Sequence, residues 1–273
     1  MAVLNTETSI ENHPGNAQTD SGSGEHSVIF EHVDFVYPDG EEAVLKDISF
    51  SAKSGETVAF IGSTGSGKSS LIQLIPRFYD RASGNIYIDG QKIEDLDINA
   101  LRSKIGFVPQ KAHLFSGTIE ENIRFGKPDA TMDEIIHAAK IAQAYDFIME
   151  NHISSRNRSL KEQPMSPAVR NSVCRIARAL IRKPEIYIYD DSFSALDFKT
   201  DARLRKALKP EIKNAIVFLV AQRVSTILDA DKIVVLDEGK IAGIGTHREL
   251  LASCPIYYEI AASQLSKEEL TYA

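Results

Sequence analysis

Eight consecutive residues, Gly62 to Ser69, carry the clearest chemical pattern in the chain. They read GSTGSGKS, which fits the phosphate-binding pattern G-x-x-x-x-G-K-[ST]. Glycines let the backbone curl so that successive N–H groups point at one anion, and a helix that starts behind the loop adds its positive end. The residues expected to contact a nucleotide are Gly62, Ser63, Thr64, Gly65, Ser66, Gly67, Lys68, Ser69 and Ser70.

The neighbours of this loop have the order that a nucleoside triphosphate site requires. Residues 57–61, TVAFI, are apolar and β-branched, as in a buried strand, and residues 69–75, SSLIQLI, predict the first turns of a helix. Lys68 would reach the β- and γ-phosphates, and the Ser69 hydroxyl would bind Mg²⁺. A Gly/Ser-rich surface turn is the alternative, and the agreement of strand, loop, lysine, hydroxyl and helix disfavours it.

Three further positions could complete such a site. Residues 186–190, IYIYD, are four apolar residues followed by Asp190, and a strand that ends in this way can deliver a carboxylate to Mg²⁺. Asp191 stands where a general base or a water-orienting group could act. Gln110 follows a short strand expected at 105–108 and could offer an oxygen to Mg²⁺ or to water, although an exposed loop amide is the alternative.

Composition limits the class of protein. The chain has 273 residues, 43% hydrophobic and 25% charged, as in a soluble globular domain with room for a subdomain. A net charge of −7 argues against a nucleic-acid partner. No apolar run approaches the ~20 residues that span a bilayer, and the N-terminus lacks a signal-peptide pattern. Two cysteines, Cys174 and Cys254, give no disulfide framework, which fits a reducing cytosol.

Strands and helices must position these residues, and the first part of the chain predicts strands. Residues 1–27 are polar and predict a linker or tail. Within 28–50, two alternating apolar runs flank a turn at Pro38-Asp39-Gly40 and predict a pair of strands. Tyr37, just before this turn, could stack on a nucleotide base, and a core aromatic is an equal alternative.

The middle of the chain predicts a helical insertion at about 112–182. A helical pattern runs from Thr118 to about Glu150, with a capping box starting at Thr131, and residues 151–168 show no periodic pattern. One helix face then follows, formed by Val169, Val173, Ile176, Ala177 and Leu180. Strand-like runs at 215–220 and 232–236 alternate with helices, which predicts a mostly parallel sheet covered on both faces.

These motifs together resemble the nucleotide-binding domain of an ABC transporter, most closely that of bacterial half-transporter exporters. The segments that carry the resemblance are FVYPDG, GSTGSGKSS, FVPQ, IARALIRKPEIYIYDDSFSALD, VAQRVSTI and ADKIVVLDEGKIAGIGTHREL, over about residues 28–263. The family's fold is an α/β P-loop NTPase with a mostly parallel central sheet, an N-terminal antiparallel β-subdomain and a helical insertion. The resemblance implies that ATP and Mg²⁺ are the cofactors.

The resemblance also implies a role for single residues. Tyr37 is the adenine-stacking aromatic, residues 62–69 are the Walker A loop, Gln110 is the Q-loop glutamine and Asp190 is the Walker B aspartate. The D-loop comprises Ser194, Ala195, Leu196 and Asp197. In the family two such domains pair head to tail, and each ATP lies between the Walker A loop of one and the LSGGQ signature of the other. The implied partners are a second nucleotide-binding domain and a transmembrane domain.

The same resemblance suggests how the chain is organised. Residues 3–10, VLNTETSI, resemble the tail that joins membrane helices to this domain, so residues 1–27 are expected to be a flexible linker from a transmembrane domain missing from this chain. Residues 28–263 would form the nucleotide-binding domain and residues 264–273 a C-terminal tail. The expected location is the cytoplasmic face of the cell membrane.

Two departures from the family pattern concern catalysis. Asp191 replaces the usual glutamate, which sets its carboxyl about a methylene away from a bound water. Gln222 replaces the switch histidine, and an amide can donate a hydrogen bond to a γ-phosphate but cannot take up a proton. Together they resemble the degenerate-site subunit of a heterodimeric exporter, which binds ATP firmly and hydrolyses it slowly.

A third departure affects the signature segment. The expected positions hold Ser166, Pro167, Ala168, Val169 and Arg170. Proline lacks the hydroxyl and the N–H, and the Cβ atoms of Ala168 and Val169 stand where backbone must approach phosphate. Possible codons for residues 160–175 spell AQGATNVSGGQKQRLS in a shifted frame, which suggests two compensating insertions or deletions, one at Arg175–Ile176 and one between about 150 and 159. A naturally diverged loop is the alternative.

The leading prediction is therefore an ATP-hydrolysing motor domain of an ABC exporter, weak or inactive as written. The alternative is a catalytically silent ATP-binding partner, because residues 159–175 lack a working signature. An ABC ATPase without a transport role is disfavoured by the exporter-like residues 3–10. A P-loop kinase is disfavoured because no lid for an acceptor substrate is evident.

Overall fold

The computed structural model describes residues 10, 12, 26–111, 114–145, 167–266 and 270. Within them the strands are β1 (Ser27–Phe35), β2 (Leu45–Lys53), β3 (Thr57–Gly62), β4 (Ser83–Ile88), β5 (Gln91–Lys92), β6 (Ile105–Val108), β7 (Ile186–Asp190), β8 (Ile216–Val220), β9 (Lys232–Asp237) and β10 (Lys240–Gly245). The α-helices are α1 (Lys68–Leu74), α2 (Ile98–Ser103), α3 (Ile119–Arg124), α4 (Met132–Ile141), α6 (Pro167–Leu180), α7 (Phe198–Glu211), α8 (His247–Ser253) and α9 (Pro255–Ala262). Short 3₁₀ turns occur at η2 (Ile93–Asp95) and η3 (Val224–Thr226).

The larger sheet has the strand order β10-β9-β3-β8-β7-β6. All its neighbouring pairs are parallel except β9 and β10, which form an antiparallel pair at one edge. Every residue of β7 and β8 is buried, as expected of strands covered on both faces. The mostly parallel central sheet that the sequence predicted is therefore confirmed.

The two faces of this sheet have different covers, and successive strand residues alternate between them. In β3, Val58 and Phe60 belong to one apolar cluster, which also contains the core of α1 and of the smaller sheet. Ala59 and Ile61 belong to the other cluster, which is shared with the helices α4, α6, α7 and α9. This alternation is the period of two that a strand imposes on its side chains.

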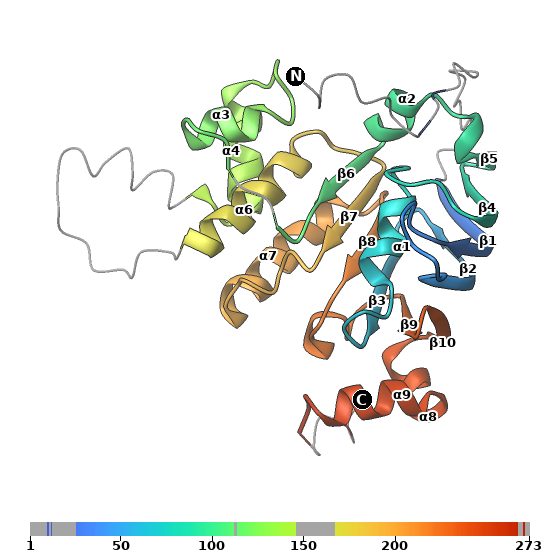
Figure 1. Cartoon of the computed structure of the whole chain (residues 1–273). Helices are drawn as coiled ribbons and strands as arrows, with labels where there is room; N and C mark the ends of the chain where they lie inside the picture. The colour runs from blue at the N-terminus through green and yellow to red at the C-terminus, as the bar shows by residue number, and fades with distance from the viewer. Residues whose placement is uncertain are drawn as a thin grey trace.

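The smaller sheet is antiparallel and has the strand order β2-β1-β4-β5. Aromatic rings join it to the larger sheet: the Phe50 ring lies 4.6 Å from that of Phe30 and 5.5 Å from that of Phe60. Figure 1 shows the smaller sheet on one side of the molecule and the helices α3, α4 and α6 at the opposite side. This arrangement confirms the expected N-terminal β-subdomain.

The helical insertion between β6 and β7 contains α3, α4 and α6. The expected capping box at Thr131 is present: Glu134 N–H donates to the Thr131 hydroxyl, and the Glu134 carboxylate accepts from Thr131 N–H. The helical pattern expected from 118 onward is broken between α3 and α4, where the chain contains Gly126 and Pro128. Proline cannot continue a helix, and a Cβ on Gly126 would lie 2.2 Å from the Arg178 carbonyl oxygen of α6.

Helix α6 has the apolar face that the sequence predicted. Val173, Ile176, Ala177 and Leu180 are buried, and Val169 packs against the same cluster. Residues 146–166, which include residues 159–166 of the expected frame-shifted segment 159–175, lie outside the described residues. Among the described residues, no helix is both long enough and apolar enough to cross a membrane.

Candidate functional site

A cavity of about 500 Å³ opens at the carboxyl ends of β3, β7 and β8. Its wall combines the glycine-rich loop after β3 with polar side chains from three other segments, namely Gln110, Asp190, Asp191 and Gln222. Two larger cavities do not contain the loop: one of about 640 Å³ lies at the amino ends of β7 and β8, and one of about 550 Å³ is lined by α7 and by residues of β3, β7 and β8. Ligands of open parallel sheets bind at the carboxyl ends of the strands, so the 500 Å³ cavity is the candidate site.

Glycine is required at two positions of the loop. A Cβ on Gly62, where φ is 153°, would lie 2.0 Å from the Leu236 carbonyl oxygen of the neighbouring strand β9. Gly67 has a φ of 97° at the position before α1, and a Cβ there would lie 2.6 Å from the Leu45 side chain. Both conformations and both close approaches exclude larger residues. The sequence pattern at these positions therefore reflects backbone geometry.

Lys68 points back into the loop. Its Nζ donates to the carbonyl oxygens of Gly62 and Ser63, at 2.9 and 2.6 Å, and to the Ser66 hydroxyl at 3.2 Å. Burial lowers the pKa of Lys68, while the nearby charges of Asp191 and Asp190 oppose that shift. The Lys68 ammonium therefore lies inside the curve of the glycine-rich loop, where the sequence pattern predicts that phosphate binds.

Ser69 and Asp190 meet although they lie 121 residues apart, because the Ser69 Oγ donates to Asp190 Oδ1 at 3.0 Å. Burial raises the pKa of Asp190, the Ser69 hydrogen bond opposes this, and the charge of Asp191 adds to the increase. A hydroxyl and a carboxylate are the hard oxygen donors that Mg²⁺ prefers. A cation would also offset the cost of two neighbouring buried carboxylates, so the donor set fits Mg²⁺.

The Asp191 carboxylate accepts hydrogen bonds from two glutamine side-chain amides. Its Oδ2 accepts a hydrogen bond from Gln222 Nε2 at 2.6 Å and another from Gln110 Nε2 at 3.0 Å. Burial raises the pKa of Asp191, whereas the hydrogen bond from Gln110 lowers it. The backbone at Asp191 has a φ of 47°, which is unusual for a residue with a Cβ. Gln110 therefore directs its amide to Asp191, and no contact with Ser69 or Asp190 is described.

Tyr37 lies beside the loop in an aromatic cluster. Its hydroxyl is 2.9 Å from the Ser70 Oγ, and its ring meets those of Phe35 and Tyr79 edge to face at 4.7 and 5.1 Å. The side chain is half-buried and packs against the core of the smaller sheet. Tyr37 thus combines a core contact with a position next to the first turn of α1.

The D-loop residues connect Asp191 to α7. The Ser194 hydroxyl donates to the Asp191 carbonyl oxygen at 2.8 Å, and Leu196 is buried. Asp197 caps α7 by accepting from Thr200 N–H at 2.9 Å. Ala195 is exposed.

The expected signature segment is described only in part. Ser166 lies outside the described residues, and α6 begins at Pro167. Ala168 is exposed, and Val169 and Arg170 are half-buried. A residue that the motifs did not single out, Arg175, donates from Nη1 to the carbonyl oxygens of Pro109 and Gln110, at 2.6 and 3.0 Å. Burial lowers the pKa of Arg175.

Three residues in and just after the C-terminal helix, where no motif pointed, also contribute to the site. Ile260, Ser263 and Gln264 line the cavity together with the loop. Gln264 follows the end of α9 and lies within the tail expected from the sequence. These side chains reach the 500 Å³ cavity because α9 folds back against the larger sheet.

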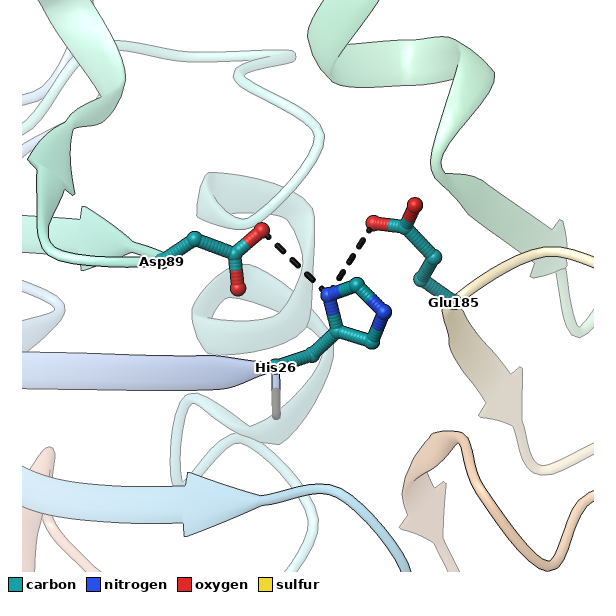
Figure 2. A group of neighbouring side chains, drawn as sticks. All are labelled: His26, Asp89 and Glu185. Carbon is teal, nitrogen blue, oxygen red and sulfur yellow. Dashed lines mark hydrogen bonds and ion pairs between the residues drawn. The ribbon is translucent and has the colours of Figure 1, made fainter. Parts of the chain in front are cut away.

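A separate polar cluster joins the start of β1 to the two sheets. Figure 2 shows the His26 Nδ1 between Asp89 Oδ2 and Glu185 Oε2, at 3.4 and 3.3 Å. Lys104 Nζ lies 2.7 Å from the same Asp89 oxygen and 2.9 Å from the same Glu185 oxygen. Because the Lys104 ammonium already pairs with both carboxylate oxygens, we interpret the cluster as a structural ion-pair network.

Comparisons with known proteins agree with this geometry. The sequence profile described as "ABC transporter" matches residues 45–194. An "Uncharacterized ABC transporter ATP-binding protein" of Bacillus subtilis is 43% identical over 250 residues, which are 88% of this chain and 42% of the relative. A "Putative multidrug export ATP-binding/permease protein" of Staphylococcus aureus is 44% identical over 246 residues, 87% of this chain and 41% of the relative.

A solved structure is also similar. It is described as a bacterial Atm1-family ABC exporter with ATP bound. It matches with a TM-score of 0.84 and 32% identity, over 97% of this chain and 46% of the exporter chain. The chain thus spans less than half the length of the relatives it matches.

Proposed function

Because the chain belongs to the ABC transporter family, we propose that it is the ATP-binding and ATP-hydrolysing motor domain of an exporter, in which ATP-driven pairing of two such domains moves membrane helices. Residues 28–263 would form this domain, with a helical subdomain at about 112–182. Residues 1–27 would be the linker from a transmembrane domain, and residues 264–273 the C-terminal tail.

The observation that carries the proposal is the contact between Ser69 Oγ and Asp190 Oδ1, at 3.0 Å. It supports a common Mg²⁺ site for the Walker A loop and the Walker B strand. Lys68 and the loop N–H groups would bind the β- and γ-phosphates, and Ser69 and Asp190 would hold the ion. When bound, Mg²⁺ would neutralise charge on the phosphate oxygens. Tyr37, beside the first turn of α1, would stack on the adenine.

The other polar residues of the cavity would act on the attacking water. Asp191 would orient it, with Gln110 and Gln222 as neighbours that hold the carboxylate and sense the γ-phosphate. The hydrogen bonds from both amides to Asp191 support a slow, degenerate-site role, because this carboxylate is already engaged. The D-loop, residues 194–197, would face the second domain.

The proposed partners are a second nucleotide-binding domain with an intact signature and a transmembrane domain. The name of the Staphylococcus aureus relative includes a permease, and the match covers only 41% of that relative, which supports a membrane part outside this chain. The domain would then work at the cytoplasmic face of the cell membrane.

A second candidate is an ATP-binding partner that never supports hydrolysis. It is favoured by Pro167, which opens α6 where the family places the signature serine. Turnover of this chain mixed with an intact partner domain separates the two candidates, because a silent partner would leave the mixture with only the turnover of the intact domain.

The proposal is tested by the change Lys68→Ala and calorimetric titration with ATP·Mg²⁺. Loss of a charged donor to phosphate is expected to weaken binding by roughly 10- to 100-fold or more. Lys46→Ala, an exposed lysine on β2, is the control and should bind as the wild type does. Unchanged affinity of Lys68→Ala would refute the nucleotide site.

A further inference from the structure

The loop of residues 221–224 carries Gln222 and connects β8 to the turn η3. One side chain from the C-terminus, Gln264, contacts the backbone of this loop twice. Its Oε1 accepts a hydrogen bond from Val224 N–H at 2.8 Å, and its Nε2 donates to the Gln222 carbonyl oxygen at 3.0 Å. A single amide therefore spans the loop from residue 222 to residue 224.

Gln264 stands on a firmly packed element. It follows α9, in which Tyr257 and Ala261 are fully buried, and its own N–H donates to the Ala261 carbonyl oxygen at 3.0 Å. The Tyr257 hydroxyl lies 2.7 Å from His247 Nδ1, which ties α9 to α8. The backbone of Gln264 is thus tied to the C-terminal helix.

The other side of the loop is fixed by the larger sheet and by Asp191. Ala221 N–H donates to the Phe60 carbonyl oxygen at 3.1 Å, and Val224 is fully buried. Between these anchors, the exposed Gln222 extends its amide to Asp191 at 2.6 Å. The reach of that amide depends on where the backbone of residue 222 lies, and Gln264 bonds directly to that backbone.

We propose that Gln264 is a positioning residue for this site: it holds the 221–224 loop so that Gln222 meets Asp191, and it thereby links the C-terminal helix to ATP turnover. The link to turnover rests on the proposed function. The two hydrogen bonds from Gln264 to the 221–224 loop can be measured whether or not the proposed function is correct.

The first test is hydrogen exchange of the Val224 amide in the full chain. Gln264→Leu keeps most of the side-chain volume and removes both hydrogen bonds. Because the Val224 N–H loses its hydrogen-bond acceptor, we expect it to exchange roughly threefold to tenfold faster, while the exchange of α9 stays unchanged. Glu259→Ala, an exposed residue of α9, is the matched control and should leave the Val224 amide unaffected.

The second test separates positioning from binding. In ATPase assays of the same full-length chains, Gln264→Leu should raise kcat at least threefold and leave the KM for ATP within twofold of wild type, since a displaced Gln222 no longer stabilises the charged Asp191 carboxylate, which then becomes a stronger base toward water. Unchanged exchange at Val224, or faster exchange with an unchanged or lower kcat, would overturn the positioning role. Failure of the wild-type chain to bind ATP would instead refute the proposed function. The exchange measurement would still decide whether Gln264 holds the 221–224 loop.

Discussion

The side-chain amide of Gln222 donates a hydrogen bond to Asp191 across 2.6 Å, from Nε2 to Oδ2. Gln110 donates to the same oxygen at 3.0 Å. Amide donors favour the charged carboxylate but cannot accept a proton from it. Both bonds stabilise the charged carboxylate and so make Asp191 a weaker base toward water, which gives the cavity a physical reason for slow hydrolysis.

This arrangement predicts how turnover responds to substitution. The isolated wild-type chain should bind ATP and hydrolyse it far below the ~10 s⁻¹ typical of enzymes. Asp191→Glu combined with Gln222→His should raise turnover, because a longer carboxylate reaches the water and an imidazole can accept a proton. The increase should appear only with a partner domain that has an intact signature. The single variants are the controls, and fast turnover by the wild-type monomer would contradict the prediction.

Asp190→Asn should separate function from stability. Burial raises the pKa of Asp190, so its charge disfavours folding at every pH above that raised pKa, and the cost decreases as the pH falls from the raised pKa to the ordinary one. Removing the charge should therefore raise the free energy of unfolding at pH 7 by about 1 kcal/mol while Mg²⁺-dependent ATP binding is lost.

Asparagine can still accept the Ser69 hydrogen bond, so the variant isolates the charge. Urea unfolding at pH 7 and calorimetry with ATP, with and without Mg²⁺, measure the two effects. A less stable Asp190→Asn variant would show that the carboxylate is not strained in the folded protein.

Lys104→Met should destabilise the chain strongly at neutral pH. Lys104 and Asp89 are both buried, and breaking such a pair typically costs about 3–5 kcal/mol. Burial opposes the charge of Asp89, but hydrogen bonds from Lys104 and Ser27 hold its pKa below the usual value. The contribution of Asp89 is therefore present above the ordinary carboxyl pKa and is lost as the pH falls through the lowered one.

The pKa of Lys104 shifts in the complementary direction. Burial lowers it, yet hydrogen bonds to Asp89 and Glu185 leave it raised, so its contribution persists at neutral pH and is lost only at alkaline pH. The difference in urea stability between wild type and Lys104→Met should shrink as the pH falls below the ordinary carboxyl pKa of 3.8, where Asp89 loses its charge. Lys240→Met, an exposed lysine on β10, is the control, and an equal effect in both variants would rule out the ion-pair network.

Restoring AQGATNVSGGQKQRLS across residues 160–175 should rescue ATP-driven pairing with an intact partner domain. It should raise hydrolysis at the Walker A loop of the partner subunit and leave ATP affinity at this chain's own loop unchanged, because the proposed signature acts across the dimer. Turnover of the mixture and calorimetry of the single chain measure these two effects.

The restored sequence also replaces Arg175, whose guanidinium contacts the carbonyl oxygens of Pro109 and Gln110. Arg175→Ser alone is therefore the matched control and should not raise the turnover of the partner. Equal turnover with the restored chain and the chain as written would mean that residues 159–175 are a working variant.

The sequence by itself determined the local parts of this protein. Residues 62–69 could be recognised because a phosphate loop depends on glycine conformations at Gly62 and Gly67 and on neighbours a few residues away. The strand ending at Asp190, the capping box at Thr131 and the parallel sheet followed from short-range periodicity for the same reason.

Only the tertiary structure decided which side chains meet. The strand order places β8 between β3 and β7, and this order brings Ser69 to Asp190 and Gln222 to Asp191. No periodic pattern in the sequence predicts that α9 folds back so that Gln264 forms hydrogen bonds with the 221–224 loop. These contacts depend on how distant segments pack against one sheet, and that packing is a property of the whole core.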